Sequence, residues 1–285
     1  MEKLHGLLNK IDDPEKCLCT YHGLRNRIAG KFLELPMDFF NATVKEVEVF
    51  LILCVRSEQP SILIIETSKP IRDADSEEFF PLFDECKQTF PSLFEGAIFV
   101  QGHETSLKAF KAYINTLPIK FNEKFGQKCA FFMTAKQQEK VMELNIALPE
   151  GYRFDKPKPE DAQVITDTWI HAGPNEIEQT RLKLKYCPSA LVRFGDDPVG
   201  FEFSSPFGTQ NHLFVLEEHR QRGLGKAVEM KLAQECIASG VIPFKFVELW
   251  NEAVLKRSNK DPLWTRQNDE NGEPLTVDFC TYIPS

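Results

Sequence analysis

The segment best equipped for chemistry is a short basic loop that contains two glycines. It reads Glu217-Glu218-His219-Arg220-Gln221-Arg222-Gly223-Leu224-Gly225-Lys226 and lies between an apolar run, His212–Leu216, and a helical pattern, Leu224–Ala238. Backbone N–H groups at the start of a helix have no partner within it and carry partial positive charge, so they suit a pyrophosphate. Glycine has no Cβ and lets the backbone approach phosphates closely. The loop is therefore predicted to bind a phosphate-bearing ligand.

This loop differs from the two most familiar phosphate motifs, and its positive charge is local. It lacks both the Gly-Lys-Ser/Thr of a P-loop and the G-x-G-x-x-G of a dinucleotide-binding fold. The whole chain is acidic, with 34 Lys and Arg against 42 Asp and Glu and a net charge of −8. We expect no nucleic-acid partner, because neutralising a phosphate backbone requires a broadly basic surface.

The elements that must position the loop follow the order β-α-α-β-β-β-α-β-α. Hydrophobic periodicity and turn residues indicate them. They are predicted at Tyr152–Phe154, in a helix that begins near Pro159, and at Glu176–Tyr186, Ala190–Phe194, Val199–Phe203, His212–Leu216, Leu224–Ala238, Val241–Leu249 and Asn251–Ser258, with a closing hairpin around Asn271-Gly272.

The first half of the chain mixes helices and strands but shows no chemical motif. Two β-branched runs, Val44–Val55 and Ser61–Glu66, predict a hairpin, and Cys129–Met133 predicts a later strand. The sequence Leu148-Pro149-Glu150-Gly151, followed by the Pro- and Lys-rich Asp155–Asp161, forbids a continuous helix. We therefore predict two domains, at residues 1–148 and 149–285.

Composition excludes several classes of protein. A chain of 285 residues that is 42% hydrophobic and 27% charged is long and apolar enough to bury a core, so it is not disordered as a whole. The longest apolar run, Val47–Val55, contains Glu48 and is too short to cross a membrane. The eight cysteines include no C-x-x-C pair, and Cys17 and Cys19 with His22 fall short of a zinc motif. We expect reduced thiols, no metal, no membrane partner, and an intracellular location, cytoplasmic or mitochondrial.

Arg220-Gln221-Arg222-Gly223-Leu224-Gly225 resembles the acyl-coenzyme A loop of the GNAT superfamily of N-acyltransferases. More specifically, residues 150–263 resemble the glycine N-acyltransferase-like family. Further matching elements are Pro159-Glu160-Asp161-Ala162, Trp169, Pro188-Ser189-Ala190, Pro198-Val199-Gly200-Phe201, Leu216-Glu217-Glu218-His219-Arg220, Asn251-Glu252-Ala253, Lys256 and Ser258. The resemblance implies an α/β fold of the GNAT type, a mixed and mostly antiparallel central sheet with flanking helices. It implies two tandem GNAT-like domains, of which residues 1–148 are degenerate and residues 149–285 bind acyl-CoA.

The same resemblance implies roles for individual residues. Phe214 and Val215 would hydrogen-bond pantetheine through their backbone, and Asn251 would hold the cofactor arm. The pyrophosphate would be cradled by Arg220, Gln221, Arg222, Gly223, Leu224, Gly225 and Lys226. Ser258 occupies the position where many superfamily members keep a tyrosine that protonates the leaving thiolate. The family's usual general base, a Glu eleven residues before Arg220, is Thr209 in this chain. Threonine cannot accept an amine proton at neutral pH.

Three alternatives remain for the base. His212 has an ordinary pKa suited to the task, and Glu202 lies on the preceding strand, although either could be structural. An ordered water that passes the proton to a backbone carbonyl is the third. Trp169 and Trp250 are predicted to be core aromatics rather than walls of an acyl pocket.

The resulting hypothesis is an N-acyltransferase that moves an acyl group from acyl-CoA, acetyl-CoA or longer, to a small amine. Glycine or another amino acid is the expected acceptor, and the amine would attack the thioester directly without a metal or an acyl-enzyme. One alternative is a non-catalytic acyl-CoA-binding or interaction module, which Thr209 would favour. Another is an acetyltransferase for protein or polyamine amines.

Overall fold

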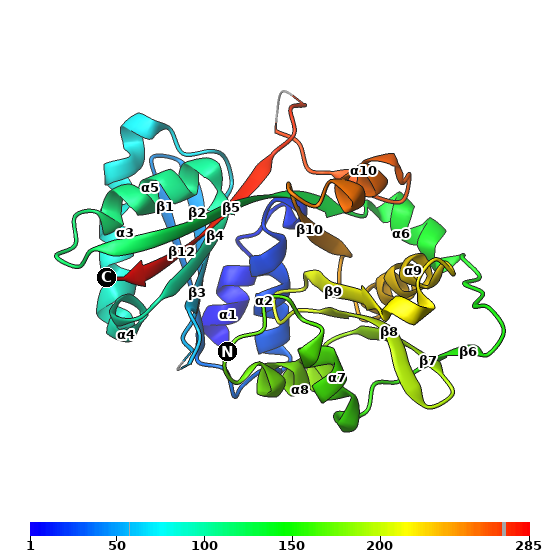
Figure 1. The fold of residues 1–285 in the computed structure, drawn as a ribbon. Coiled ribbons are helices and arrows are strands. Elements are labelled where there is room, and N and C mark those ends of the chain that lie inside the picture. The colour runs from blue at the N-terminus through cyan, green and yellow to red at the C-terminus, as the bar shows by residue number, and fades with distance from the viewer. Residues whose placement is uncertain (57, 270–271) are drawn as a thin grey trace. The chain divides into compact units, whose positions relative to one another are not determined.

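The computed structural model describes residues 1–56, 58–269 and 272–285, which divide into two compact units. Unit 1 consists of Met1–Ala130, Val247–Glu252 and Gln267–Ser285, and unit 2 of Phe131–Phe246 and Ala253–Arg266. Both combine a mostly antiparallel sheet with flanking helices (Figure 1). The predicted mixed α/β fold class is thus confirmed.

Unit 1 contains a sheet in the order β1-β2-β3-β4-β12-β5. Its strands are β1 (Met37–Val44), β2 (Val47–Cys54), β3 (Ser61–Thr67), β4 (Ile98–His103), β5 (Phe121–Phe132, whose last two residues belong to unit 2) and β12 (Thr276–Pro284). Its helices are α1 (Glu2–Leu8), α2 (Leu18–Ile28), α3 (Phe80–Thr89), α4 (Pro91–Glu95) and α5 (Glu104–Ile114), with 3₁₀ turns η1 (Pro14–Lys16) and η2 (Asp73–Phe79). Of the strand pairs that the described residues of unit 1 form, β3–β4 is parallel and the others are antiparallel. Alternate strand residues such as Leu51, Leu63 and Val100 pack with Phe83 of α3 and Phe110 of α5 in the main core.

Unit 2 contains strands in the order β10-β9-β8-β7-β6, and only the β9–β10 pair is parallel. The strands are β6 (Tyr152–Asp155), β7 (Ser189–Phe194), β8 (Asp197–Ser204), β9 (Gln210–Val215), β10 (Phe244–Glu248, whose last two residues belong to unit 1) and β11 (Thr265–Arg266, paired with the end of β5). The helices are α6 (Ala135–Met142), α7 (Ala162–Asp167), α8 (Glu176–Tyr186), α9 (Leu224–Ala238) and α10 (Glu252–Lys260, whose first residue belongs to unit 1), with 3₁₀ turns η3 (Pro159–Asp161) and η4 (Glu217–His219). The predicted element order from residue 152 to residue 260 is confirmed.

Helices cover the two faces of the unit 2 sheet. On one face, Val228 and Leu232 of α9 pack with Val192 and Val199 of the strands. On the other, Ile165 of α7 and Leu184 of α8 pack with the Phe201 and Phe203 rings of β8. A side chain of β8 or β9 therefore points either toward α9 or toward the α7–α8 layer.

The compact units divide the chain at different places from the predicted 148/149 boundary. No helix continues through this boundary, because α6 ends at Met142 and the next element, β6, is a strand that begins at Tyr152. The C-terminal segment nevertheless belongs to unit 1, because β12 pairs with both β4 and β5. A fragment of residues 149–285 would carry β12 without either partner.

Other differences concern strand ends. The hairpin between β2 and β3 is confirmed, but the predicted run Val44–Val55 is broken by a tight turn at Lys45-Glu46, where φ is +48° and +64°. Strand β1 and the first half of β5 were not predicted, since the exposed residues of β5 give no apolar alternation. The predicted hairpin turn at Asn271-Gly272 includes Asn271, which lies outside the described residues.

Candidate functional site

The parallel strands β9 and β10 separate soon after they begin. Their ladder contains the single pair Lys245↔Gln210, while β9 continues to Val215 beside β8. From His212 to Val215, the edge of β9 that faces away from β8 pairs with no strand in the described part of the chain. Leu216 N–H donates to the Val199 carbonyl on β8 at 2.9 Å. Because successive N–H groups of a strand point to opposite sides, the N–H of Val215 points to the open edge.

A β-bulge marks the start of this open edge. The register between β8 and β9 passes from Phe203↔Asn211 to Phe201↔Phe214, which leaves an extra residue on β9. His212 lies in that interval with a φ of +60°, a backbone conformation uncommon for a residue other than glycine. Bulges of this kind re-aim side chains and end regular pairing.

The glycine-containing loop follows β9 directly and ends in α9. Gly223 is the N-cap of α9 with a φ of +80°, and Gln221 also has a positive φ of +61°. Backbone N–H groups from Gln221 to Gly225 donate to no group that the structure describes. An added Cβ would meet nothing within 4 Å at Gly223 and only Val215 Cγ2, at 4.0 Å, at Gly225. The chain itself leaves the space next to these N–H groups open.

The cations of the loop already have partners within unit 2. Arg220 Nε donates to the Val215 carbonyl at 2.9 Å, and its guanidinium lies 5.5 Å from the centre of the Phe214 ring. Arg222 Nη2 donates to the Glu218 carbonyl at 3.4 Å. Lys226 forms an ion pair with Asp261. An incoming phosphate would therefore compete with weak carbonyl contacts for the two arginines and with a carboxylate for the lysine.

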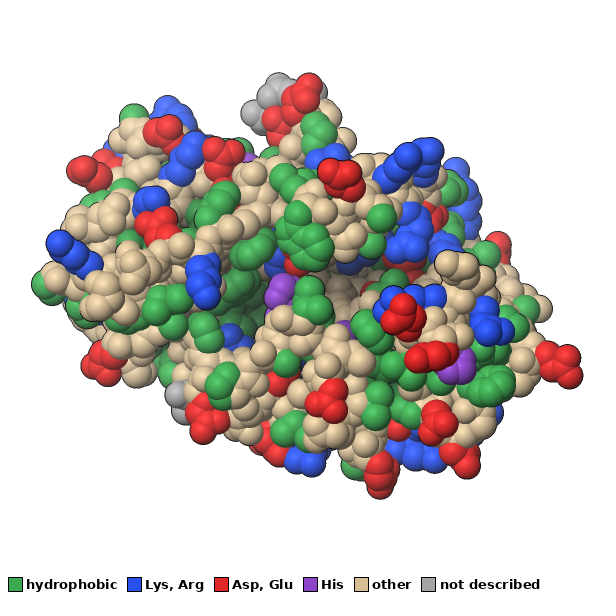
Figure 2. Space-filling view, in the orientation of Figure 1, with side chains coloured by type: hydrophobic (Ala, Val, Ile, Leu, Met, Phe, Trp, Pro, Cys, Tyr) green, Lys and Arg blue, Asp and Glu red, His purple; other side chains and the backbone are tan. Residues whose placement is uncertain are grey.

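Basic residues are also frequent on the helices α6, α9 and α10 of this region. Figure 2 shows Lys and Arg side chains gathered over these helices. Their exposed Lys and Arg residues include Lys136, Lys140, Lys226, Lys256, Arg257 and Lys260. This local basic surface contrasts with the net charge of −8 and would attract a polyanionic ligand.

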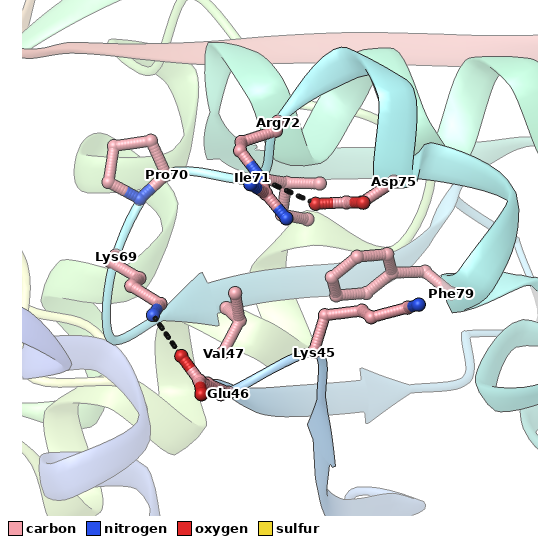
Figure 3. A pocket seen from close by; sticks show the side chains of 9 residues that line it. All are labelled: Lys45, Glu46, Val47, Lys69, Pro70, Ile71, Arg72, Asp75 and Phe79. Carbon is pink, nitrogen blue, oxygen red and sulfur yellow. Dashed lines mark hydrogen bonds and ion pairs between the residues drawn. The ribbon is translucent and has the colours of Figure 1, made fainter.

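Unit 1 also contains a parallel strand pair, and this pair stays together for longer. Its strands β3 and β4 are paired at five successive positions, Ser61–Ile65 with Ile98–Gly102. The connection that follows β3, Lys69-Pro70-Ile71-Arg72, has no glycine and lines a hollow of about 210 Å³ (Figure 3). The cations there are neutralised, Lys69 by Glu46 at 3.7 Å and Arg72 by Asp75 at 2.6 Å.

His212 points toward the α7–α8 layer. Its Nε2 shares a hydrogen bond with Thr168 Oγ1 at 3.1 Å, and its ring lies 4.6 Å from the Trp169 ring. Burial, with a smaller contribution from the charge of Lys183, lowers the pKa of His212 to about 3. The imidazole is therefore neutral at physiological pH, and its proton affinity is low for a general base.

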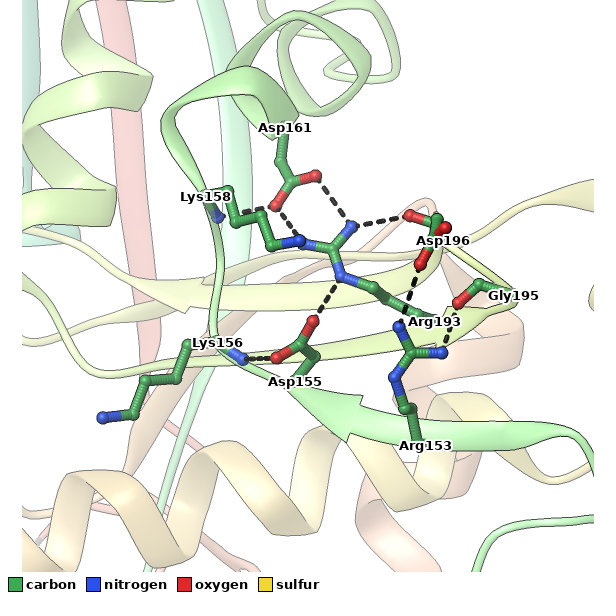
Figure 4. A network of polar contacts seen from close by, with 8 residues as sticks. All are labelled: Arg153, Asp155, Lys156, Lys158, Asp161, Arg193, Gly195 and Asp196. Carbon is green, nitrogen blue, oxygen red and sulfur yellow. Dashed lines mark hydrogen bonds and ion pairs between the residues drawn. The ribbon is translucent and has the colours of Figure 1, made fainter.

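A buried ion-pair network fixes the helix that brings Thr168 to His212. Arg193 of β7 donates from Nη1 and Nη2 to both carboxylate oxygens of Asp161 at 2.9 and 2.6 Å, and from Nε to Asp155 at 2.6 Å (Figure 4). These hydrogen bonds raise the pKa of Arg193. Asp161 immediately precedes α7, so the network ties α7 to β6 and β7.

Glu202 points to the opposite face, toward α9, where it is 3% exposed. Burial, together with the negative charge of Glu229, raises the pKa of Glu202 well above its ordinary value. Glu229 of α9 is itself paired with Lys245 of β10. Glu202 is therefore a buried residue and does not face solvent. The raised pKa favours the protonated form of the carboxyl, which cannot accept a proton, and this weighs against Glu202 as the base.

Ser258 of α10 is also buried, and its hydroxyl has no hydrogen-bond partner in the described structure. Glu202 and His212 thus lie on opposite sides of the sheet. Asn251 directly precedes α10, and its N–H donates to the Glu248 carbonyl at 3.0 Å. Trp250 is 67% exposed, so its prediction as a core aromatic is wrong.

Sequence reasoning missed Glu229 and Lys245. Each interrupts an apolar segment, Glu229 between Val228 and Met230 and Lys245 between Phe244 and Phe246. Opposite charges inserted into two apolar segments are the signal that could have suggested a buried pair.

No protein-family model matches the sequence, and no curated protein matches it. Among solved structures, a Drosophila protein is similar over 99% of this chain and 96% of its own, with a TM-score of 0.75 and 16% identity. This likeness shows a shared fold. Looser likenesses include a tandem GNAT protein from the clavulanic acid biosynthesis pathway (TM-score 0.49, 10% identity, 94% of this chain and 87% of that one). A GCN5-related N-acetyltransferase from Kribbella flavida is similar at a TM-score of 0.48 and 12% identity, over 87% of this chain and 90% of its own. The last two superpose too loosely to decide anything about this chain.

No helix among the described residues is both long and apolar enough to cross a membrane. No group of three or more His, Cys, Asp or Glu side chains among them could hold a metal ion.

Proposed function

We propose that the chain is an acyl-CoA-dependent N-acyltransferase that acylates a small amine, glycine or another amino acid. The observation that carries the proposal is the separation of β9 from β10 directly before the glycine loop. The separation leaves strand amides without partners, and the loop leaves helix N–H groups without partners. A ligand that is a pyrophosphate at one end and a chain of amides at the other matches both features.

The residues present fit coenzyme A. The N–H groups from Gln221 to Gly225, with Arg220, Arg222 and Lys226, would bind the pyrophosphate. The backbone of Phe214 and Val215 would bind the pantetheine amides. Bound acyl-CoA supplies an activated thioester, and the chain's part is to orient that group and exclude water from it.

Val215 has a second role in this proposal. Its N–H points to the open edge of β9 and would stabilise the oxyanion that forms when the amine attacks the acyl carbonyl. Removing one such donor typically costs about 10²–10³-fold in kcat. Arg220 holds the Val215 carbonyl and so keeps this segment of β9 extended.

The amine would enter largely as the free base. His212, neutral and hydrogen-bonded to Thr168, is the residue proposed to accept the amine proton, and its low pKa makes it a weak base. Thr209 lies in the turn between β8 and β9, where its N–H donates to Ser205 Oγ at 3.2 Å, and it supplies no carboxylate. The rate should therefore depend strongly on how much amine is already deprotonated.

The rival is a non-catalytic acyl-CoA-binding module, which the absence of a carboxylate at Thr209 favours. Thiol release from a panel of acyl-CoAs, measured against amino acids and polyamines, separates the two. We expect release with at least one amino acid. CoA binding without thiol release for any amine across the pH range would favour the binding module, and release only with polyamines or peptide lysines would replace the amino-acid acceptor.

A further inference from the structure

A network of alternating charges connects the glycine loop of unit 2 to the point where β9 and β10 separate. Lys226, in the first turn of α9, forms an ion pair with Asp261, and its Nζ also lies 3.8 Å from Glu229 Oε2. The other oxygen of this carboxylate, Glu229 Oε1, accepts a hydrogen bond from Lys245 Nζ of β10. Lys245 in turn pairs with Gln210 of β9 in the β9–β10 ladder. The network therefore links a cation of the proposed phosphate site to the position from which the two strands diverge.

The two ends of this network differ in exposure. The Lys226 side chain is 44% exposed, whereas the side chains of Glu229 and Lys245 are 8% and 9% exposed. An exposed ion pair contributes little to stability and is readily exchanged for another anion, because water and salt screen it. A buried pair is hard to break, since removing either partner leaves an uncompensated charge in the interior. A phosphate at the loop would therefore take Lys226 and leave the pair of Glu229 and Lys245 in place.

Trp264 lies at the buried end of the network. It is 5% exposed, and Lys245 Nζ is 4.2 Å from the centre of its ring. The turn that carries the ring is held by Asp261, whose carbonyl accepts from the Trp264 N–H at 3.1 Å and whose carboxylate accepts from the Leu263 N–H at 3.0 Å. The two anions beside Lys226 thus also shape the surroundings of the Lys245 ammonium, one by direct pairing and the other through the Trp264 ring.

We propose that Glu229 and Lys245 are positioning residues for the acyl-CoA site: their ion pair holds β10 against α9, and a phosphate at the loop strengthens this pair. The role rests on the proposed binding of coenzyme A by the glycine loop. Without ligand, the Glu229 carboxylate is shared between two lysines. When the phosphate draws Lys226 away, the charge of the carboxylate acts on Lys245 alone, in an interior where attraction between charges is stronger than in water. β10 is then held more tightly at Lys245, so the part of β9 beyond Gln210 keeps its open edge for the ligand.

Thermodynamic linkage makes this effect reciprocal. If the ligand strengthens the ion pair, the ion pair must increase the affinity for the ligand by the same factor, although Lys245 itself contacts no phosphate. Such couplings are typically about 5–150-fold, and we expect about 10-fold here. A purely structural ion pair would stabilise the free and the ligand-bound chain equally and would leave the affinity unchanged.

The first test uses Trp264 as a reporter, because an ammonium group close to an indole ring alters its fluorescence. In the variant Trp169→Phe, Trp250→Phe, Trp264 is the remaining tryptophan of the chain. Titration with coenzyme A, and separately with inorganic pyrophosphate, should change the emission in step with the binding measured by calorimetry. When Lys226→Met is added, saturating ligand should leave the emission unchanged. When Lys231→Met is added instead, as a matched control on the same helix but outside the network, the response should remain.

The second test separates positioning from stability. The double variant Glu229→Gln, Lys245→Met removes both buried charges together, so neither is left unpaired and the chain should stay folded. The two removed charges are opposite and adjacent, so the direct electrostatic attraction of the phosphate changes little. We expect the free energy of unfolding in urea to stay near that of the natural chain while the affinity for coenzyme A falls about 10-fold. Lys245→Arg, which keeps the ion pair, should retain more of the affinity than the double variant.

The outcomes distinguish this role from the proposed function. Natural affinity for coenzyme A in the folded double variant, or an emission change that is the same with and without Lys226→Met, overturns the positioning role and leaves the transferase intact. If the double variant does not fold, the Trp264 titration decides the question, because it leaves the buried pair unaltered. Failure of the natural chain to bind coenzyme A in calorimetry overturns both.

Discussion

Replacement of Gly225 by alanine should separate what the fold requires from what the ligand requires. Gly225 lies in the first turn of α9, and an added Cβ would make only an ordinary contact with Val215 Cγ2 at 4.0 Å. Glycine within a helix costs about 0.5–1 kcal/mol relative to alanine. Gly225→Ala should therefore raise the free energy of unfolding by up to about 1 kcal/mol, and the melting temperature by about 2–4 °C.

The affinity of Gly225→Ala for coenzyme A should fall, although its stability rises. The new methyl group would project into the open space next to the N–H groups of Gln221 to Gly225. A phosphate displaced by this methyl group loses hydrogen bonds that the backbone N–H groups donate to its charged oxygens. Each such hydrogen bond contributes about 1.5–3 kcal/mol. The loss of one such bond corresponds to roughly 10–100-fold weaker binding.

Titration calorimetry with coenzyme A and urea denaturation measure the two changes on the same preparation. Gly223→Ala is the matched control, because its φ of +80° should make alanine destabilising by about 1–2 kcal/mol. The double variant Gly223→Glu, Gly225→Glu should abolish binding through charge repulsion. Unchanged affinity in Gly225→Ala and in the double variant would refute the assignment of the loop to phosphate.

Three further predictions follow from the charges of unit 2. Arg193→Met should lower the free energy of unfolding by about 3–5 kcal/mol in urea, because it leaves the buried carboxylate of Asp161 without its partner; a loss below 1 kcal/mol would contradict this. Thr209→Glu should raise the rate of thiol release near neutral pH and move the optimum down from the alkaline range, and a pH–rate profile that does not move would argue against a missing base. The folded state holds His212 neutral with a pKa lowered to about 3 from 6.5, so the unfolded state binds more protons and stability should fall as the pH drops from 6.5 toward 3. His212→Gln should flatten this fall, which is at most about 1.4 kcal/mol per pH unit, in denaturation curves taken across that range.

The sequence predicts the elements around the loop well because their signals are local. The β7 and β8 strands are short apolar runs separated by a Gly-Asp-Asp-Pro turn, and α9 begins directly after two glycines. Strand β12 lacks such a signal for its place in the fold, since its partners, β4 and β5, lie more than 140 residues away. Pairing over that distance is decided by the finished sheet rather than by neighbouring residues, which is why the 148/149 boundary does not coincide with the compact units.

The candidate site likewise has one part that the sequence predicts and one part that it does not. The phosphate loop is contiguous, so residue types and spacing are enough to predict its chemistry. The charge environment of Glu202 is built from α9, β10 and α10, and only the folded chain brings Glu229, Lys245 and Arg257 to one carboxyl. A carboxylate on a strand would ordinarily be expected to be ionised, and the reversal of that expectation comes from burial and from a neighbour of like charge.

The contrast between the two parallel strand pairs explains why the proposed chemistry belongs to unit 2. In unit 1 the β3–β4 ladder is closed, and Gly102 is needed for this closure because a Cβ there would lie 2.5 Å from the Ile65 carbonyl oxygen. In unit 2 the ladder stops after Gln210, a bulge follows at His212, and the far edge of β9 pairs with no strand among the described residues. The two parallel pairs thus differ in how far they stay paired, and the pair that separates early leaves backbone groups that a substrate can satisfy.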